Sequence, residues 1–429
     1  MDKIIYTKKY ISAILIITTL LFSCNATQTK NTKINNNQET WITIFLHGIV
    51  SAQPVLSFKT IRLLAKDLIE NTIYEKYVEN VRPDPYFNAN QAKQGLGLQS
   101  IDLTKKDAKD GCAALANIFE KQYKWMGNKS NNLYYTFGWT GFLSRKKRYQ
   151  DAIELYKTLS RLTQNFKTKG VNPKIRLIGF SNGAGLCLDL PLVIKQENLK
   201  RNFKIDELIM LGMPIQRSRD FLICDPIFGK KYHFYSGADR IQILDLSDPY
   251  KFFSRRKFKT RLGFKLPKDL IQVKLQLLRK SGRWANSYKK GKLTARHAHN
   301  IKECSPGHCE WFFFGWTNKF YRDNFAIDPL PVVSIIPTLI NIINESGYKS
   351  TYSKRYGHLI KMSVRPYDNA VVLRRRRNKK VVEFIPDNQF DELKNIAKSY
   401  PFKKTTKEEY NKKVQEKLKM AKEQMETSS

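Results

Sequence analysis

The chain has 429 residues, a formal net charge of +38 at pH 7 and six histidines. No internal repeat is evident, which argues against a repeat array, and the length suffices for one large domain with insertions. The sequence has no His-Glu-x-x-His spacing and no Cys-x-x-Cys pair, so a zinc site lacks support and we expect neither a metal nor a cofactor.

The amino terminus has the pattern of an export signal. Lys3, Lys8 and Lys9 precede an apolar run over residues 11–22, which Ser23 and Cys24 follow. A run of about a dozen residues is short against the roughly twenty that span a bilayer. The pattern resembles a bacterial lipoprotein signal peptide, which implies removal of residues 1–23 and acylation of Cys24.

The residues after this signal are polar. Residues 24–40 are rich in Asn, Thr, Gln and Lys, a composition typical of a disordered tether. With Asn25 rather than aspartate after the cysteine, the outer membrane of a two-membrane envelope is favoured. We therefore expect an exported, membrane-anchored lipoprotein. Export also makes nucleic acid an unexpected partner, although the charge alone would suggest one.

The folded region begins with an apolar run over residues 41–46, rich in β-branched and aromatic side chains and followed by His47 and Gly48. This pattern predicts a buried strand that leads into a loop. Beyond it, the apolar spacing predicts a helix over residues 112–125, a strand over 132–137 and a helix over 148–166. Alternating strands and helices of this kind predict an α/β fold with five or six parallel strands.

The most informative motif is Gly-Phe-Ser-Asn-Gly at residues 179–183, which fits Gly-x-Ser-x-Gly. An apolar strand is predicted before it, over residues 174–178, and the small residues after it can begin a tightly packed helix. In such a nucleophile elbow, a strained turn holds the serine hydroxyl clear of the sheet, and the glycines avoid the neighbouring backbone. Ser181 is therefore the candidate nucleophile.

Together with the earlier Phe-Leu-His-Gly at residues 45–48, this motif resembles the α/β-hydrolase superfamily, particularly its lipases and esterases. The resemblance implies a doubly wound, mostly parallel sheet and an oxyanion hole of backbone N–H groups at Gly48, Ile49 and Asn182. His47 lies too early in the chain to be the catalytic base. The family order of the triad is serine, then an acid, then a histidine.

The acid and the base follow from this order. Strands are predicted over residues 207–211 and 232–236, and the family acid commonly follows the second within a few residues, which selects Asp239 over Asp245 and Asp248. A Ser-Pro-Gly turn places His308 on a loop after a strand predicted over residues 293–299, where the family base lies. His299 is the alternative base, and His358 is a weaker candidate.

Two regions of the chain lie outside the segments that carry this resemblance. Residues 248–292 hold fifteen Lys or Arg against two Asp, interleaved with aromatic side chains, and are predicted to form an insertion within a hydrolase domain over residues 41–345. They can form a lid or meet anionic lipid or envelope polymer, although a general compositional bias explains the charge equally well. Residues 346–429 are predicted as a basic carboxyl-terminal extension with a hairpin whose tip lies at residues 374–380.

These observations predict a serine hydrolase that cleaves a carboxylic ester, with Ser181, Asp239 and His308 as its triad and an acyl-ester or lipid as its substrate. The alternative is a catalytically inactive lipoprotein of the same fold that binds anionic envelope components. Apart from the acylated Cys24, five cysteines remain, which is an odd number, and Cys304 and Cys309 can pair across the loop of His308.

Overall fold

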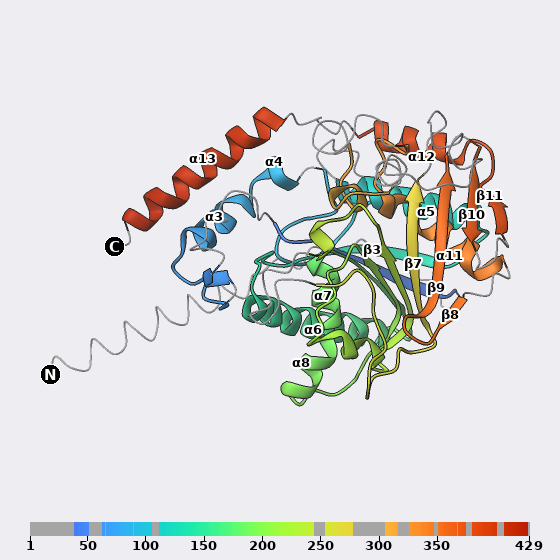
Figure 1. Ribbon diagram of the computed structural model, residues 1–429, viewed down its shortest axis with the longest axis horizontal. Helices are drawn as coiled ribbons and strands as arrows, with labels where there is room; N and C mark the ends of the chain where they lie inside the picture. The colour runs from blue at the N-terminus through green and yellow to red at the C-terminus, as the bar shows by residue number, and fades with distance from the viewer. Residues whose placement is uncertain are drawn as a thin grey trace. The chain divides into compact units, whose positions relative to one another are not determined.

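The chain divides into two compact units, Met1–Gln38 and Glu39–Ser429, and the fold below is that of the second. The expected Cys24 acylation site, His299, Asp245, Asp248 and Cys304 lie outside the described residues and stay predictions. The computed structural model (Figure 1) describes residues 38–50, 62–64, 66–88, 90–104, 111–243, 254–277, 305–315, 326–346, 351–366, 368–374, 380–400 and 407–427.

An 11-stranded sheet, in the order β11-β10-β9-β7-β6-β5-β4-β1-β3-β2 with β8 beside β9, forms the centre of the fold. Six parallel pairings join β3, β1, β4, β5, β6, β7 and β9, whereas β2, β8, β10 and β11 pair antiparallel at the margins. The strands are β1 (Thr40–Leu46), β2 (Gly97–Ser100), β3 (Asn131–Gly138), β4 (Lys174–Phe180), β5 (Ile205–Leu211), β6 (Phe228–Tyr235), β7 (Leu270–Leu277), β8 (Thr351–Ser353), β9 (Gly357–Arg365), β10 (Ala370–Arg374) and β11 (Lys380–Phe384).

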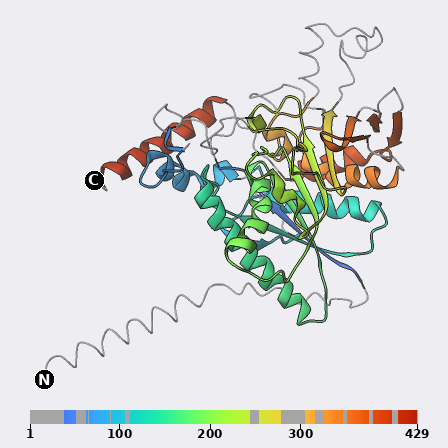
Figure 2. The ribbon, with the colours of Figure 1, turned by 60° about the horizontal axis from the view of Figure 1, so that its bottom comes forward.

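Helices cover both faces of this sheet, as Figures 1 and 2 show from two directions. Helices α6, α7 and α8 pack with β1, β4 and β5 in one apolar cluster, and α5, α11 and α12 pack on the opposite face in another. The α-helices are α3 (Ile73–Val81), α4 (Pro85–Asn88), α5 (Gly111–Trp125), α6 (Arg145–Lys167), α7 (Asn182–Leu188), α8 (Leu190–Gln196), α11 (Ile336–Glu345), α12 (Gln389–Lys398) and α13 (Lys407–Glu426); the 3₁₀ turns are η1 (Asp220–Cys224), η2 (Ile241–Ile243), η3 (Cys309–Trp311) and η4 (Val332–Ile335).

The structure confirms the strands predicted over residues 41–46, 132–137, 174–178, 207–211 and 232–236, the helices predicted over 112–125 and 148–166, and the helix expected after the serine motif. Two expectations about later segments need correction. Residues 248–292 are not purely an insertion, because they contain β7, which pairs with both β6 and β9. Residues 346–429 are not a separate extension either, since β9, β10 and β11 continue the same sheet. The parallel strands therefore outnumber the five or six expected.

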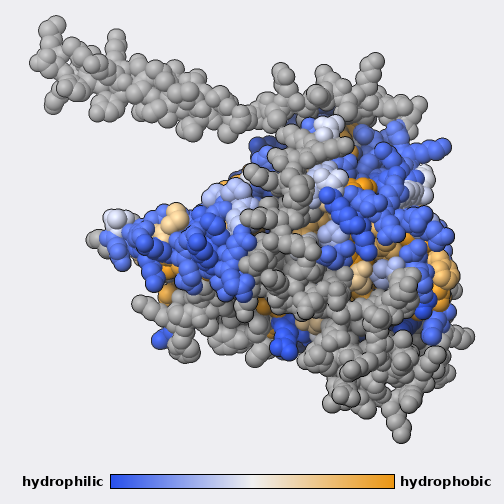
Figure 3. Space-filling model, turned by 90° about the horizontal axis from the view of Figure 1, so that it is seen from above, coloured by the Kyte–Doolittle hydropathy of each residue, from blue (hydrophilic) through white to orange (hydrophobic). Residues whose placement is uncertain are grey.

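The carboxyl-terminal helix α13 is anchored to the rest of the fold. It lies along α3, where Val414 and Ala421 are buried among apolar side chains such as Tyr74 and Tyr77. Lys417 forms a salt bridge with Asp84 at 2.7 Å. The remainder of its surface is predominantly hydrophilic, as the left of the view from above shows (Figure 3).

Among the helices of the described residues, none combines the length and the apolar character needed to cross a bilayer.

Candidate active site

Ser181 occupies a strained turn between β4 and α7. Its φ of 53° and ψ of −127° lie in a region that residues with a side chain rarely adopt. The flanking glycines are required by close approach: a Cβ at Gly179 would lie 2.4 Å from Ala184 Cα, and one at Gly183 would lie 2.1 Å from the carbonyl oxygen of His47. The Gly-x-Ser-x-Gly spacing therefore reflects backbone packing around the serine.

The structure brings Ser181, His308 and Asp239 together from three separate segments of the chain. His308 Nε2 lies 2.9 Å from Ser181 Oγ, and His308 Nδ1 lies 3.0 and 2.9 Å from the two carboxylate oxygens of Asp239. Since a carboxylate accepts, Nδ1 carries the proton and Nε2 is left to accept from the serine hydroxyl. This is the tautomer that a general base needs.

Asp239 is fully buried and is held by further donors. Trp311 Nε1 donates to its Oδ2 at 3.1 Å, and the backbone N–H of Gln242 donates to its Oδ1 at 3.0 Å. The guanidinium of Arg256 donates two hydrogen bonds to the Asp239 carbonyl oxygen, at 3.0 and 2.9 Å. Such bonds fix both the carboxylate and its loop, so Asp239 is held in position to accept from His308 Nδ1.

The loop after β1 lies against the serine turn. A Cβ at Gly48 would lie 3.1 Å from Ser181 Cβ, and the N–H of Val50 donates to the Gly141 carbonyl oxygen at 3.1 Å. Asn182 is the first residue of α7, so its N–H has no carbonyl partner within that helix. The two segments that meet at Ser181 therefore carry the backbone N–H groups expected for an oxyanion hole, which are those of Gly48, Ile49 and Asn182.

His47 is a structural residue of this loop. It is buried, and burial followed by the charges of Lys93 and Arg82 holds its pKa well below the usual value. Its Nδ1 lies 2.6 Å from the Gly48 carbonyl oxygen, while its Nε2 lies 3.3 Å from the backbone nitrogen of Trp139. The neutral ring therefore donates through Nδ1 and accepts through Nε2, which leaves neither nitrogen for proton transfer.

Behind the serine turn lies a buried ionic cluster. Arg148 Nε donates to Asp189 at 3.1 Å and its NH1 donates to the side-chain oxygen of Asn182, also at 3.1 Å. Arg219 lies 2.7 Å from the same aspartate, and burial lowers the pKa of Arg219 to about 10. The cluster connects α6 to the first residue of α7, so it fixes the position of the Asn182 backbone.

Sequence reasoning missed the supporting roles of Arg148, Arg256 and Trp311. Arg148 was included in a predicted helix, and a cation on the buried side of that helix was the available signal. Trp311 is fully buried. Its i, i+3 spacing from His308 was the sign that both side chains can reach one carboxylate.

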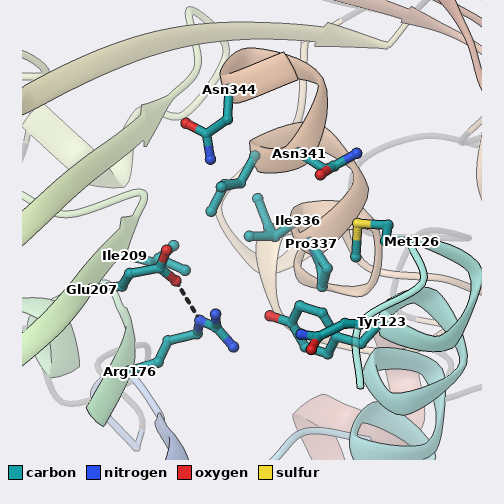
Figure 4. Close-up of a pocket in the computed structure, with 11 residues that line it drawn as sticks. Tyr123, Met126, Arg176, Glu207, Ile209, Ile336, Pro337, Asn341 and Asn344 are labelled. Carbon is teal, nitrogen blue, oxygen red and sulfur yellow. Dashed lines mark hydrogen bonds and ion pairs between the residues drawn. The ribbon is translucent and has the colours of Figure 1, made fainter. Parts of the chain in front are cut away.

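A cavity of about 180 Å³ lies elsewhere, between the sheet and helices α5 and α11 (Figure 4). Its polar wall includes Arg176, whose Nε donates to Glu207 at 2.6 Å. Arg176 precedes Ser181 by five residues of extended chain, about 16 Å at ~3.3 Å each. The cavity therefore belongs to the opposite end of the parallel strands from the Ser181 site.

His358, the weaker base candidate, lies near the amino end of β9 beside the ring of Tyr352, away from Ser181. Within the ranges that the structure describes, no three His, Cys, Asp or Glu side chains gather as metal ligands would. The chain matches no known family model, and no curated protein is found as a relative. The function of this protein therefore has to be inferred from the site itself.

Proposed function

We propose that this protein is a serine hydrolase that cleaves a carboxylic ester, with a lipase-like or esterase-like α/β-hydrolase fold. The observation that carries the proposal is the unbroken hydrogen-bonded series from Asp239 through His308 to Ser181. A metal-binding or purely structural role would not require Ser181 to adopt a positive φ. It would also not require the hydroxyl of Ser181 to lie 2.9 Å from the unprotonated nitrogen of His308.

The position of these residues in the fold supports the same proposal. Ser181 follows β4 and Asp239 follows β6, so both lie beyond the carboxyl ends of parallel strands, where open α/β sheets bind ligands. The chain order of serine, acid and histidine is that of the α/β hydrolases. The strained turn after β4 and the His-Gly loop after β1 agree with that fold type.

The proposed reaction is acyl transfer in two steps. His308 Nε2 accepts the proton of Ser181 as its Oγ attacks the ester carbonyl carbon, and the protonated imidazole then gives that proton to the departing alcohol. Water attacks the acyl-serine by the reverse route. Backbone N–H groups at Asn182 and at Gly48 or Ile49 would stabilise the negative oxygen, while Asp239 holds the imidazolium.

The location of this activity is proposed from the amino terminus. The resemblance of residues 1–24 to a lipoprotein signal implies acylation of Cys24 and a place in the bacterial cell envelope, where acyl esters of lipids are available substrates. The basic surface can then bring the enzyme to anionic lipid or polymer. Hydrolysis itself requires no cofactor under this mechanism.

Hydrolysis of p-nitrophenyl esters of increasing chain length tests the proposal, with the full chain compared with its Ser181→Ala, His308→Ala and Asp239→Asn variants. We expect each variant to lose at least about a thousandfold in kcat/KM, because triad members act as a unit. Ser160→Ala, a helix-surface change, is the matched control and should keep full activity. Equal rates in wild type and Ser181→Ala would favour an inactive, anion-binding lipoprotein.

A further inference from the structure

Four cations lie in one row across the carboxyl-terminal part of the sheet. Lys274 in β7 pairs with Lys361 in β9, Lys361 pairs with Arg374 in β10, and Arg374 pairs with Lys380 in β11. Directly paired residues of neighbouring strands point to the same face. We call these four residues the cationic row; three strand spacings of ~4.8 Å make it about 14 Å long.

Such a row opposes folding, because like charges placed directly opposite each other on a sheet are destabilising. Within the described residues, none of the salt bridges involves Lys274, Lys361 or Lys380. Burial lowers the pKa of Lys274, and the charges of Lys361, Lys257 and Arg256 lower it further. The neighbouring cations therefore add to the repulsion, and an anion on this face would relieve it.

The face that carries the row is exposed in part, at Lys361 and Lys380, whereas Ser363 and Val372 on the same face are buried. Its alternate residues point the other way, where Val273, Ile360 and Leu373 are buried against the helices α5, α11 and α12. Lys361 and Lys380, by contrast, are exposed.

Apolar side chains flank the row at the sheet edge. Val382 and Phe384 follow Lys380 at spacings of two and four residues in β11, so they share its face. They are 41% and 67% exposed, respectively. Large exposed apolar residues beside exposed lysines are the combination that a membrane interface favours.

The row also lies level with the candidate nucleophile. A line of paired residues crosses the sheet from β4 to β9. One residue further along their own strands or turn lie Ser181, Lys274 and Lys361. Strand β4 is three strand spacings, about 14 Å, from β7. That line consists of Phe180, Leu211, Phe234, Val273 and Ile360.

We propose that the cationic row, with Val382 and Phe384, is a docking surface for a lipid bilayer that carries anionic headgroups. Lysine and arginine side chains bind the negative surface of such a bilayer, and the two apolar side chains enter the boundary between headgroups and acyl chains. A soluble polyanion would use the cations alone. The exposed Phe384 and Val382 therefore favour a bilayer. Binding does not depend on the proposed hydrolysis.

Sedimentation with vesicles tests the proposal, using the full chain with Cys24→Ser so that no acyl group is attached. Partitioning onto phosphatidylcholine vesicles with phosphatidylglycerol is compared with partitioning onto phosphatidylcholine alone. In a Lys274→Gln, Lys361→Gln, Lys380→Gln variant we expect the preference for anionic vesicles to fall about tenfold to a hundredfold. Ser181→Ala should bind like its parent, which separates this proposal from the proposed hydrolysis.

A matched triple variant, Lys195→Gln, Lys398→Gln, Lys422→Gln, removes the same charge from exposed positions on or beside other helices. An equal loss in this variant would overturn the proposal in favour of net charge. Phe384→Ser should weaken vesicle binding while leaving binding to soluble polyphosphate unchanged. If the row variant lost polyphosphate binding alone, a linear polyanion would be the partner. Unfolding of the row variant is not expected, since it removes repulsion; circular dichroism checks this.

Discussion

At the scale of single residues, Trp311 offers a direct test of how the candidate triad is held. Its indole donates to Asp239 Oδ2, and its ring fills the space beside Gly212. In Trp311→Phe the hydrogen bond is lost while an aromatic ring remains. We expect kcat for ester hydrolysis to fall about tenfold with KM little changed. The reason is that the hydrogen bond holds Asp239, and the imidazolium that Asp239 stabilises forms only during the reaction.

The control for this change is Trp125→Phe, at the end of α5 and away from the site. It removes the same indole group without touching Asp239. A Trp311→Phe enzyme with normal kcat would show that the indole only fills space, and a rise in KM alone would assign it to substrate binding.

Lys93 is a second residue whose replacement has a measurable effect, in this case on the stability of the fold. It is 5% exposed, and burial, reinforced by Arg82, lowers its pKa from 10.5 to about 6. Between these values the unfolded chain binds the additional proton, so this residue makes stability rise as pH increases from 6 towards 10.5. Lys93→Met should remove that contribution.

The expected result is a Lys93→Met variant that is more stable than wild type near pH 7, by on the order of 1–3 kcal/mol, with the difference shrinking by pH 10. Its lost hydrogen bond to the side chain of Asn88 opposes part of the gain. Urea unfolding at several pH values measures the difference. A variant that is less stable at every pH would mean that the lysine is charged and satisfied in the fold.

At the scale of elements, the serine turn shows how packing dictates sequence. A Cβ added at Gly183 meets the His47 carbonyl oxygen at 2.1 Å, whereas one at Gly185, in the same helix, would lie 3.8 Å from the side chains of Arg148 and Asn182. Gly183→Ala should therefore destabilise the protein by roughly 2 kcal/mol or more and reduce esterase activity, because the turn must shift.

Gly185→Ala is the matched control and should leave activity unchanged, with stability equal or slightly higher since alanine favours helix. Denaturant unfolding together with ester hydrolysis measures both variants. Equal tolerance of the two substitutions would contradict the tight contact between α7 and the β1 loop.

Local patterns explain which elements could be predicted. The strand, turn and helix around Ser181 have a continuous apolar run and glycines fixed by backbone contact, so sequence identified them. Strand β7 was missed because Lys274 and two glutamines interrupt its apolar residues within a basic segment. These polar residues alternate with the apolar ones although Gln272 is fully buried, and no local signal distinguishes that pattern from a surface insertion.

At the scale of the whole molecule, the topology assembles a site from residues 181, 239 and 308. Family order allowed Asp239 and His308 to be selected, yet the support from Arg148 and Arg256 depends on contacts across the fold that spacing cannot predict. Likewise, the cationic row becomes visible only once four strands are in register. Long-range pairing is thus the part that sequence reasoning did not reach.

The net charge of +38 has a consequence for the molecule as a whole. Mutual repulsion among so many cations opposes the compact state, and salt screens it. We expect the thermal unfolding midpoint to rise as sodium chloride is added from low to physiological concentration, and to rise less in the variant that lacks Lys274, Lys361 and Lys380. A midpoint that falls with salt would indicate that attractive ion pairs dominate.

The most direct test of the central claim is covalent labelling of the full chain with a fluorophosphonate, followed by mass spectrometry of the modified peptide. An activated serine is predicted to give one adduct on Ser181, abolished in Ser181→Ala and strongly slowed in His308→Ala. An adduct elsewhere, or no adduct while the protein is folded and in the presence of lipid vesicles, would contradict the proposed nucleophile.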